Sequence, residues 1–134
     1  MGFLIDSSLW IDFSRRRSSL ALRAQAGQWI AHPGAANCEP VNFEILRHAT
    51  SEERPGLTAY LNTLPMLATP KTIWSDATSL GQACRDRGFT VSSLDLLIAT
   101  IALHHDAELV TYDADYSFVA QAEPRLRVNI LRRA

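Results

Sequence analysis

The sequence contains almost no lysine. Of its 13 basic residues only Lys71 is a lysine, so the other 12 are arginines, and the formal net charge is −1. This balance excludes a protein that attracts nucleic acid through an overall positive field. Arginine offers a planar fork of donors that suits phosphate and carboxylate groups, although a GC-rich genome produces the same bias. Any nucleic acid would have to be bound by local groups of arginine.

Long hydrophobic runs are also missing. The longest, such as LLIATIAL at residues 96–103, are far shorter than the ~20 residues that a membrane helix needs. Residues 1–11 lack the basic start and the small-residue cleavage site of a signal peptide, and Asp6 interrupts their apolar stretch. We therefore expect a cytoplasmic protein without a membrane segment.

The motifs of several enzyme classes are absent. Cys38 and Cys84 stand apart from each other and from any C-x-x-C spacing, so we expect two buried free thiols. There is neither a G-x-S-x-G nucleophile motif nor a glycine-rich phosphate loop. His104 and His105 end a predicted helix, where cationic side chains suit the helix dipole. Nucleophilic serine and zinc chemistry are therefore not indicated.

The length of 134 residues fits one domain with one core, spanning residues 1–134. Hydrophobic residues make up 47% and charged residues 20% of the chain, which is ordinary for a globular protein. We find no internal repeat, linker or low-complexity segment.

Strand-like and helix-like segments alternate along the chain. Strands are expected at residues 2–6, 35–38, 107–113 and 126–131, with a strand-like connector at 64–70. Helices are expected at residues 7–13, 20–31, 40–49, 55–64, 76–87, 92–106 and 115–120, with Ser93 as a cap and Gly88 as a stop. This alternation predicts an α/β fold with a parallel sheet covered on both faces.

Two acids follow predicted strands. Asp6 ends the first strand, and Asp113 ends the strand after the most apolar helix, within LVTYDADY at residues 109–116. Residues just past the carboxyl ends of parallel strands gather at one edge of the sheet, where ligands bind. We therefore expect Asp6 and Asp113 to meet.

Two further acids lie in apolar helices. Asp95 is surrounded by leucine, isoleucine and alanine, and Glu44 lies between Phe43 and Ile45. A carboxylate is costly to bury unless it is paired or bound to a metal. The alternatives are that Asp95 stabilises the helix dipole from the first turn and that Glu44 is exposed.

Gathered at one edge, these four acids would repel one another and their pKa values would rise. A hard divalent cation would relieve the repulsion. Because all candidate ligands are oxygens and no His or Cys group has zinc spacing, Mg²⁺ or Mn²⁺ is favoured over Zn²⁺. Such ions typically activate water and neutralise charge in phosphoryl chemistry.

Three segments together resemble a known family. DSSLWIDF at residues 6–13, FEILRHA at 43–49 and SLDLLIATIALHHDAELVTYDADY at 93–116 are similar to PIN-domain ribonucleases, specifically the VapC-type toxins of type II toxin–antitoxin pairs. The resemblance covers essentially the whole chain. It implies a three-layer α/β/α fold with a central parallel sheet, and an Mg²⁺- or Mn²⁺-dependent endoribonuclease that hydrolyses RNA phosphodiester bonds with metal-activated water.

The resemblance assigns roles to individual residues. The catalytic acids would be Asp6, Glu44, Asp95 and Asp113. Asp6, Asp95 and Asp113 would bind the metal, with Glu44 and Asp115 as further candidates. Asp115 could instead act through water or cap the next helix. Ser7 and Ser8 would position the site, whereas Asp12 is expected at the surface or paired with an arginine. Arg47 and His48 depart from the small residues common in the family.

The family also implies partners. RNA is the substrate, and Arg15, Arg16 and Arg17 are candidates for phosphate contacts, the alternative being a solvated loop. A homodimer and a small cognate antitoxin are implied, with Leu9, Phe13 and Leu20 as candidate interface residues. The three tryptophans fit core or interface positions better than base stacking. A non-catalytic PIN-like binding module in a protein complex is the alternative function. The sequence does not identify the target RNA.

Overall fold

Five parallel strands form the centre of the computed structural model, which describes residues 2–134. Their order in the sheet is β3-β2-β1-β4-β5. The strands are β1 (Phe3–Ile5), β2 (Ala35–Cys38), β3 (Met66–Leu67), β4 (Glu108–Thr111) and β5 (Val128–Ile130). Each pairing between neighbours is parallel, so the predicted α/β fold with a parallel sheet is confirmed.

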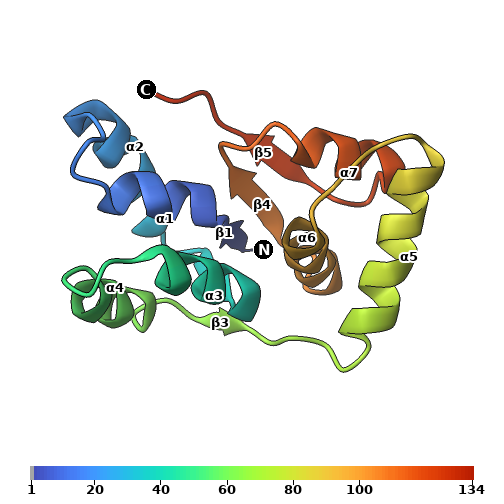
Figure 1. Cartoon of the computed structure of the whole chain (residues 1–134), viewed down its shortest axis with the longest axis horizontal. Helices are drawn as coiled ribbons and strands as arrows, with labels where there is room; N and C mark the ends of the chain where they lie inside the picture. The colour runs from blue at the N-terminus through green and yellow to red at the C-terminus, as the bar shows by residue number, and fades with distance from the viewer. Residues whose placement is uncertain (1) are drawn as a thin grey trace.

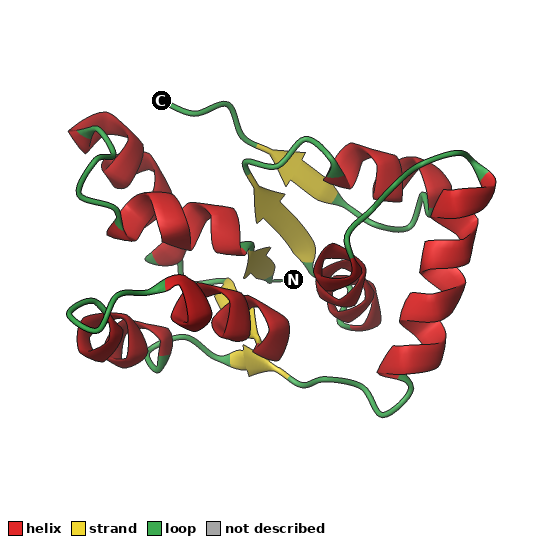
Figure 2. Cartoon of the chain, in the orientation of Figure 1, coloured by secondary structure: helices red, strands yellow, loops and turns green. Residues whose placement is uncertain are grey.

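Seven helices within residues 2–134 connect and cover these strands. They are α1 (Ser7–Ser14), α2 (Leu20–Ile30), α3 (Glu39–His48), α4 (Arg54–Leu61), α5 (Ile73–Asp86), α6 (Ser93–His104) and α7 (Tyr116–Ala122). In Figure 1, α1 to α4 lie on the left and α5 to α7 on the right. Figure 2 shows the strands between these two groups of helices. Right-handed crossovers place connections on opposite faces when the chain reverses direction along the sheet, as it does after β3.

Local sequence explains where several helices begin and end. Ser19 caps α2 by accepting the backbone N–H of Leu22 at 3.0 Å. Ser92, rather than the predicted Ser93, caps α6 by accepting the N–H of Asp95 at 3.2 Å. Gly88 follows α5 with a φ of 80°, a left-handed conformation that glycine adopts without strain. The predicted stop at Gly88 is confirmed, although α5 begins three residues earlier than expected.

The register between β1 and β4 sets the core. Leu4 pairs with Leu109 and Ile5 with Val110, and all four side chains are fully buried. Helix α6 adds further buried apolar side chains to the same core, which explains its nearly continuous apolar sequence. The next residues along the two strands are Asp6 and Thr111, so the register brings these two side chains together.

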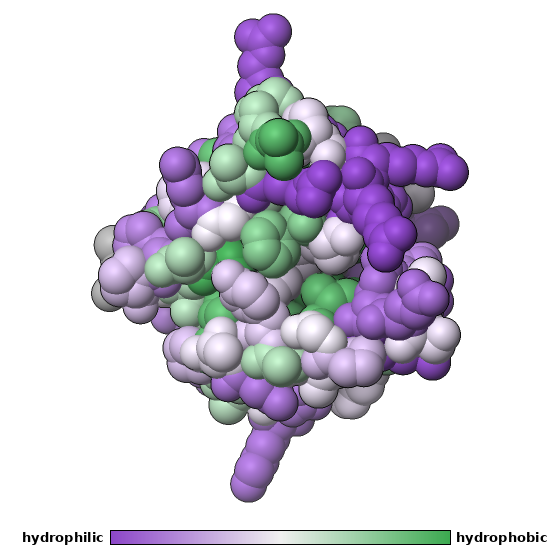
Figure 3. Space-filling model, turned by 90° about the vertical axis from the view of Figure 1, so that its left-hand side faces the viewer, coloured by the Kyte–Doolittle hydropathy of each residue, from purple (hydrophilic) through white to green (hydrophobic). Residues whose placement is uncertain are grey.

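The first helix differs from expectation. Leu9 was predicted at a subunit interface, but its side chain is fully buried, so this prediction is wrong. Its position three residues past the strand-ending acid turns it toward the sheet. Phe13 is partly buried and lies edge-on to Trp10 and Tyr60. Leu20 is 81% exposed at the start of α2. Figure 3 faces the left-hand side of Figure 1, where α2 lies, and shows apolar patches there among hydrophilic side chains.

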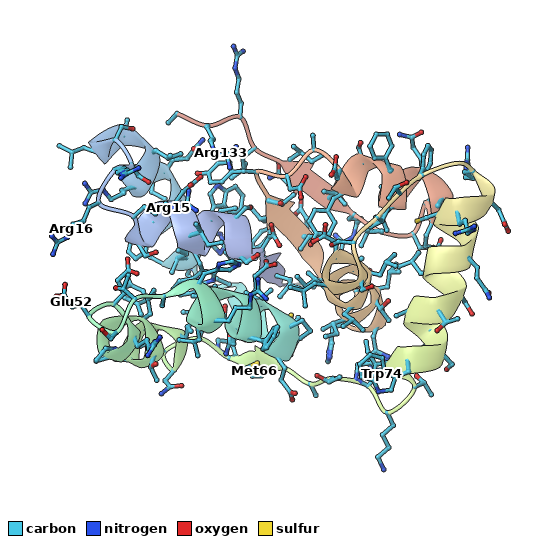
Figure 4. All side chains as sticks on the ribbon, in the orientation of Figure 1. Arg15, Arg16, Glu52, Met66, Trp74 and Arg133 are labelled. Carbon is cyan, nitrogen blue, oxygen red and sulfur yellow. The ribbon has the colours of Figure 1, made fainter. Side chains whose placement is uncertain are left out.

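The cysteines and tryptophans divide between core and surface. Cys38 and Cys84 are free and buried, as predicted. Trp10 is fully buried, whereas Trp74 is 71% exposed at the start of α5 (Figure 4). At the end of α3, Arg47 and His48 are both exposed, so their departure from the family pattern does not disturb the packing. Within residues 2–134, every helix is too short or too polar to cross a membrane.

The buried position of Leu9 gives a first prediction. Leu9→Ala removes a fully buried side chain, so the free energy of unfolding should fall by about 2 to 5 kcal/mol. Leu20→Ala, a matched change at an exposed position, should alter it by less than about 0.5 kcal/mol. Urea unfolding followed by circular dichroism measures both. Equal effects of the two substitutions would contradict the assignment of Leu9 to the core.

Candidate active site

Asp6 lies directly after β1, at the carboxyl edge of the sheet. Its backbone N–H donates to Val110 O at 2.9 Å, which continues the ladder between β1 and β4. Its Oδ2 accepts hydrogen bonds from Ser8 Oγ and Thr111 Oγ1, both at 2.8 Å, and from Ser8 N at 3.3 Å. Asp6 is only 3% exposed. Oδ2 therefore accepts all three of these hydrogen bonds, and Oδ1 accepts none of them.

The other oxygen of Asp6, Oδ1, shares a tyrosine hydroxyl with Asp95. Tyr116 OH lies 3.2 Å from Asp6 Oδ1 and 3.1 Å from Asp95 Oδ1. Asp95 reaches this point because it occupies the first turn of α6, where Ser92 fixes its backbone. Tyr116 begins α7 and is 1% exposed. Three elements distant in sequence thus meet at one hydroxyl.

The pKa values reflect this crowding of acids. Burial, helped by the charges of Asp6 and Asp113, raises the pKa of Asp95 to about 6 against the opposing effect of Ser92. Burial also raises the pKa of Asp6, although the hydrogen bonds from Ser8 and Thr111 offset part of this effect. Burial, followed by the two nearby acids, holds the pKa of Tyr116 well above 10. The tyrosine hydroxyl therefore remains a donor at neutral pH.

Asp113 and Asp115 follow β4 but differ in environment. Asp113 is partly buried; its N–H donates to Thr111 Oγ1 at 2.9 Å, and its Oδ1 accepts the N–H of Asp115 at 2.9 Å. Asp115 is exposed and precedes α7 without capping it through its side chain. Asp113 raises the pKa of Asp95, so its charge reaches that acid. Of the pair, Asp113 is thus the acid that lies close to Asp95.

Glu44 contacts the serine that directly follows Asp6. Ser7, the residue after Asp6, donates its hydroxyl to Glu44 Oε1. Glu44 is partly exposed on α3, and α3 packs against both α1 and α6. The two serines after Asp6 therefore serve different acids, since Ser8 bonds Asp6 and Ser7 bonds Glu44.

The donor set fits a hard divalent cation in its chemistry. All the acidic groups present oxygen, the ligand that Mg²⁺ and Mn²⁺ prefer, and the pKa of Asp95 is raised in part by two other carboxylates. Within residues 2–134, no three His, Cys, Asp or Glu side chains lie close enough together to hold a metal ion as they stand. Asp95 and Asp113 are only partly buried, so their carboxylates are accessible from solvent.

The remaining predicted residues lie outside this cluster. Arg15, Arg16 and Arg17 are exposed and follow the last residue of α1, whereas Asp6 precedes its first residue. Figure 4 shows Arg15 and Arg16 at the left of the molecule. The eight residues of α1 span about 12 Å. Roughly this helix length therefore separates the backbone of Arg15 from that of Asp6. Asp12 accepts from Arg133 Nε at 2.8 Å and so has an arginine partner.

Two residues of the site have no role assigned by the sequence patterns. Thr111 donates to Asp6 and accepts from the backbone of Asp113. Tyr116 links Asp6 to Asp95. The signal for Thr111 was its place at the end of β4 opposite Asp6. Tyr116 carried only the general signal that a buried tyrosine finds a partner for its hydroxyl.

Comparison with known proteins places this site in a family. A family model of the PIN domain matches residues 3–122. VapC ribonuclease Mb1587 of Mycobacterium bovis is 34% identical over 123 residues, which cover 88% of this chain and 91% of that protein. Ribonuclease VapC11 of Mycobacterium tuberculosis matches with the same identity and coverage.

Solved structures share the fold. A chain of VapBC2 from Rickettsia felis, bound to a DNA fragment from its promoter, has a TM-score of 0.77 at 15% identity, and the match covers 98% of this chain and 100% of that one. A toxin–antitoxin complex from Klebsiella pneumoniae gives a TM-score of 0.73 at 20% identity, covering 99% and 100%. Together with the matched family and the relatives at 34% identity, these observations show that the chain belongs to the PIN-domain VapC ribonucleases, the toxins of toxin–antitoxin systems.

Proposed function

We propose that this ribonuclease is an endonuclease that hydrolyses RNA phosphodiester bonds with Mg²⁺ or Mn²⁺ held by Asp6, Asp95 and Asp113. The observation that carries the proposal is the meeting of Asp6 and Asp95 at one hydroxyl, with the charge of Asp113 close enough to raise the pKa of Asp95. Acids that repel one another at the ligand-binding edge of a parallel sheet are arranged for a cation.

Different side chains would position the acids that bind the ion and the acid at the edge of the site. Ser8 and Thr111 fix Asp6 through Oδ2, so Oδ1 is the oxygen that would hold the cation. Ser7 orients Glu44 at the rim, where this acid accepts a proton or holds a water molecule. When bound, the cation lowers the pKa of water and neutralises charge on the scissile phosphate. No protein nucleophile is required, and Cys38 cannot supply one because burial raises the pKa of its thiol to about 12.

RNA binding must overcome the negative charge of the acids. Arg15, Arg16 and Arg17 provide three exposed cations a helix length away, and we assign them to phosphates flanking the cleaved bond. Their distance from the acids separates the two tasks: the acids hold the ion, and the arginines hold the strand.

The partners follow from the family. The structural neighbours include toxin–antitoxin complexes, and we propose that this chain pairs with a small cognate antitoxin and forms a homodimer. With Leu9 in the core, Leu20 and the partly exposed Phe13 remain as candidate interface residues. The alternative of a non-catalytic binding module would require the acids to bind no cation.

The acids give the central prediction. Asp6→Asn and Asp95→Asn should each lower Mn²⁺-dependent cleavage of RNA by at least about 100-fold, since each removes a charge that holds the ion. Asp113→Asn should lower it more than Asp115→Asn does. Asp86→Asn, at an exposed position on α5, is the control and should cleave like the wild type. Full activity in the first two variants, or equal activity in EDTA, would contradict the metal mechanism.

The raised pKa of Asp95 predicts a pH-dependent stability of the metal-free protein. Because the folded protein holds the proton with a pKa of about 6 against an ordinary value of 3.8, ionised Asp95 destabilises the fold, and stability is lost as the pH rises through about 4 to 6. Asp95→Asn should therefore be more stable than the wild type at pH 7 in EDTA, with the difference vanishing near pH 4. Thermal melting across this range measures it, and a difference independent of pH would refute the expectation.

The arginine assignment predicts a change in salt dependence. In the Asp6→Asn background, which leaves RNA uncut, replacing Arg15, Arg16 and Arg17 with glutamine should weaken single-stranded RNA binding. The slope of log affinity against log salt should decrease by about 0.7 for each phosphate that the variant no longer binds. The matched triple lysine variant keeps the charges and should retain the slope. Unchanged slopes in the glutamine variant would show that these arginines do not bind RNA.

A further inference from the structure

Tyr116 hydrogen-bonds to two acids of the site, Asp6 and Asp95. Its hydroxyl lies 3.2 Å from Asp6 Oδ1 and 3.1 Å from Asp95 Oδ1. The two acids come from the end of β1 and the first turn of α6, and the tyrosine begins α7. A single hydroxyl proton is thus shared between two carboxylates that otherwise repel each other.

The hydroxyl lies on the buried side of the acids rather than at the molecular surface. Tyr116 is 1% exposed and Asp6 is 3% exposed, whereas Asp95 and Asp113 are only partly buried. Solvent, and any cation arriving from it, therefore reaches Asp95 and Asp113 more readily than the tyrosine hydroxyl. Each carboxylate oxygen has two lone pairs, so an oxygen that accepts from Tyr116 retains a second position for a cation.

The orientation of Asp6 depends on both of its oxygens. Ser8 and Thr111 hold Oδ2, and Tyr116 provides the only hydrogen bond to Oδ1 among the described residues. The same hydroxyl connects Asp95 of α6 to α7. The hydroxyl of Ser92, which also lies beside Asp95, only caps α6 itself. Removing the tyrosine hydroxyl would leave Asp95 free to rotate away from Asp6, as repulsion between the two carboxylates favours.

We propose that Tyr116 is a positioning residue for the cation: its hydroxyl stays behind Asp6 and Asp95 and holds them facing one another when the ion binds. This inference rests on the proposed function. Partners that hydrogen-bond to metal-ligating side chains typically contribute 10- to 100-fold to metal affinity. In this chain, the tyrosine fills that role for two ligands at once.

Tyr116→Phe tests the proposal because it removes only the hydroxyl. Titration with MnCl₂ in a calorimeter, without RNA, should show affinity about 10- to 100-fold weaker than that of the wild type. Tyr112→Phe is a matched control: its buried ring also loses a hydroxyl bond, donated to Gln25 Oε1 at 2.7 Å, away from the acids. This variant keeps the backbone bond from Tyr112 N to Ser8 and loses only a hydroxyl that shares no partner with the acids, so it should bind Mn²⁺ within about twofold of the wild type.

Other outcomes distinguish positioning from its alternatives. Unchanged Mn²⁺ affinity in Tyr116→Phe would overturn the proposal, and tighter binding would show instead that the hydroxyl occupies the place of the cation. Incorporation of 4-aminophenylalanine at position 116 keeps a donor there and should restore the affinity. A lack of restoration would overturn the role of position 116 as a hydrogen-bond donor to the two acids. Thermal melting in EDTA checks that each variant is folded.

The same titrations separate the role of Tyr116 from the proposed function. If the wild type binds no Mn²⁺, the metal mechanism itself is wrong. If the wild type binds Mn²⁺, Asp6→Asn abolishes binding and Tyr116→Phe binds normally, only the role of Tyr116 is rejected.

Discussion

Repulsion between carboxylates is the constraint on which the rest of the site depends. Asp6 is buried at the carboxyl end of β1, and Asp95 faces it from α6. Burying two such groups would oppose folding unless donors surround them. The hydroxyls of Ser8, Thr111 and Tyr116 provide these donors. The neighbouring residues thus make it possible to fold a site in which two carboxylates lie this close together.

The geometry of the sheet explains how so few residues achieve this. In a parallel pair the register fixes which side chains follow the last paired residues, and here Ile5 pairs with Val110. Asp6 and Thr111 must then be neighbours. The residue before Asp113 also matters, because Tyr112 N donates to Ser8 Oγ at 3.0 Å. One serine therefore connects the end of β1 to the end of β4.

The sequence was sufficient to predict the features that depend on local pattern. These features are the acids that follow strands, such as Asp6 and Asp113, and the run of apolar residues in α6. The position of Leu9 was missed because periodicity shows that a helix has an apolar face but not which layer covers it. The contact of Tyr116 with Asp95 was missed because it depends on how α7 packs against α6, a relation set by the whole core rather than by any short segment.

The pairing of β1 with β4 has a consequence for the synthesis of the protein. The first acid is the sixth residue of the chain, whereas its partners on β4 lie at residues 108–111. Domains acquire their long-range contacts only after the segments involved have been synthesised. While most of this ribonuclease is still being translated, Asp6 has neither the β4 strand beside it nor a facing acid. The site therefore assembles only after β4 and α7 have been synthesised, because Asp6 finds its hydrogen-bond partners Thr111 and Tyr116 there.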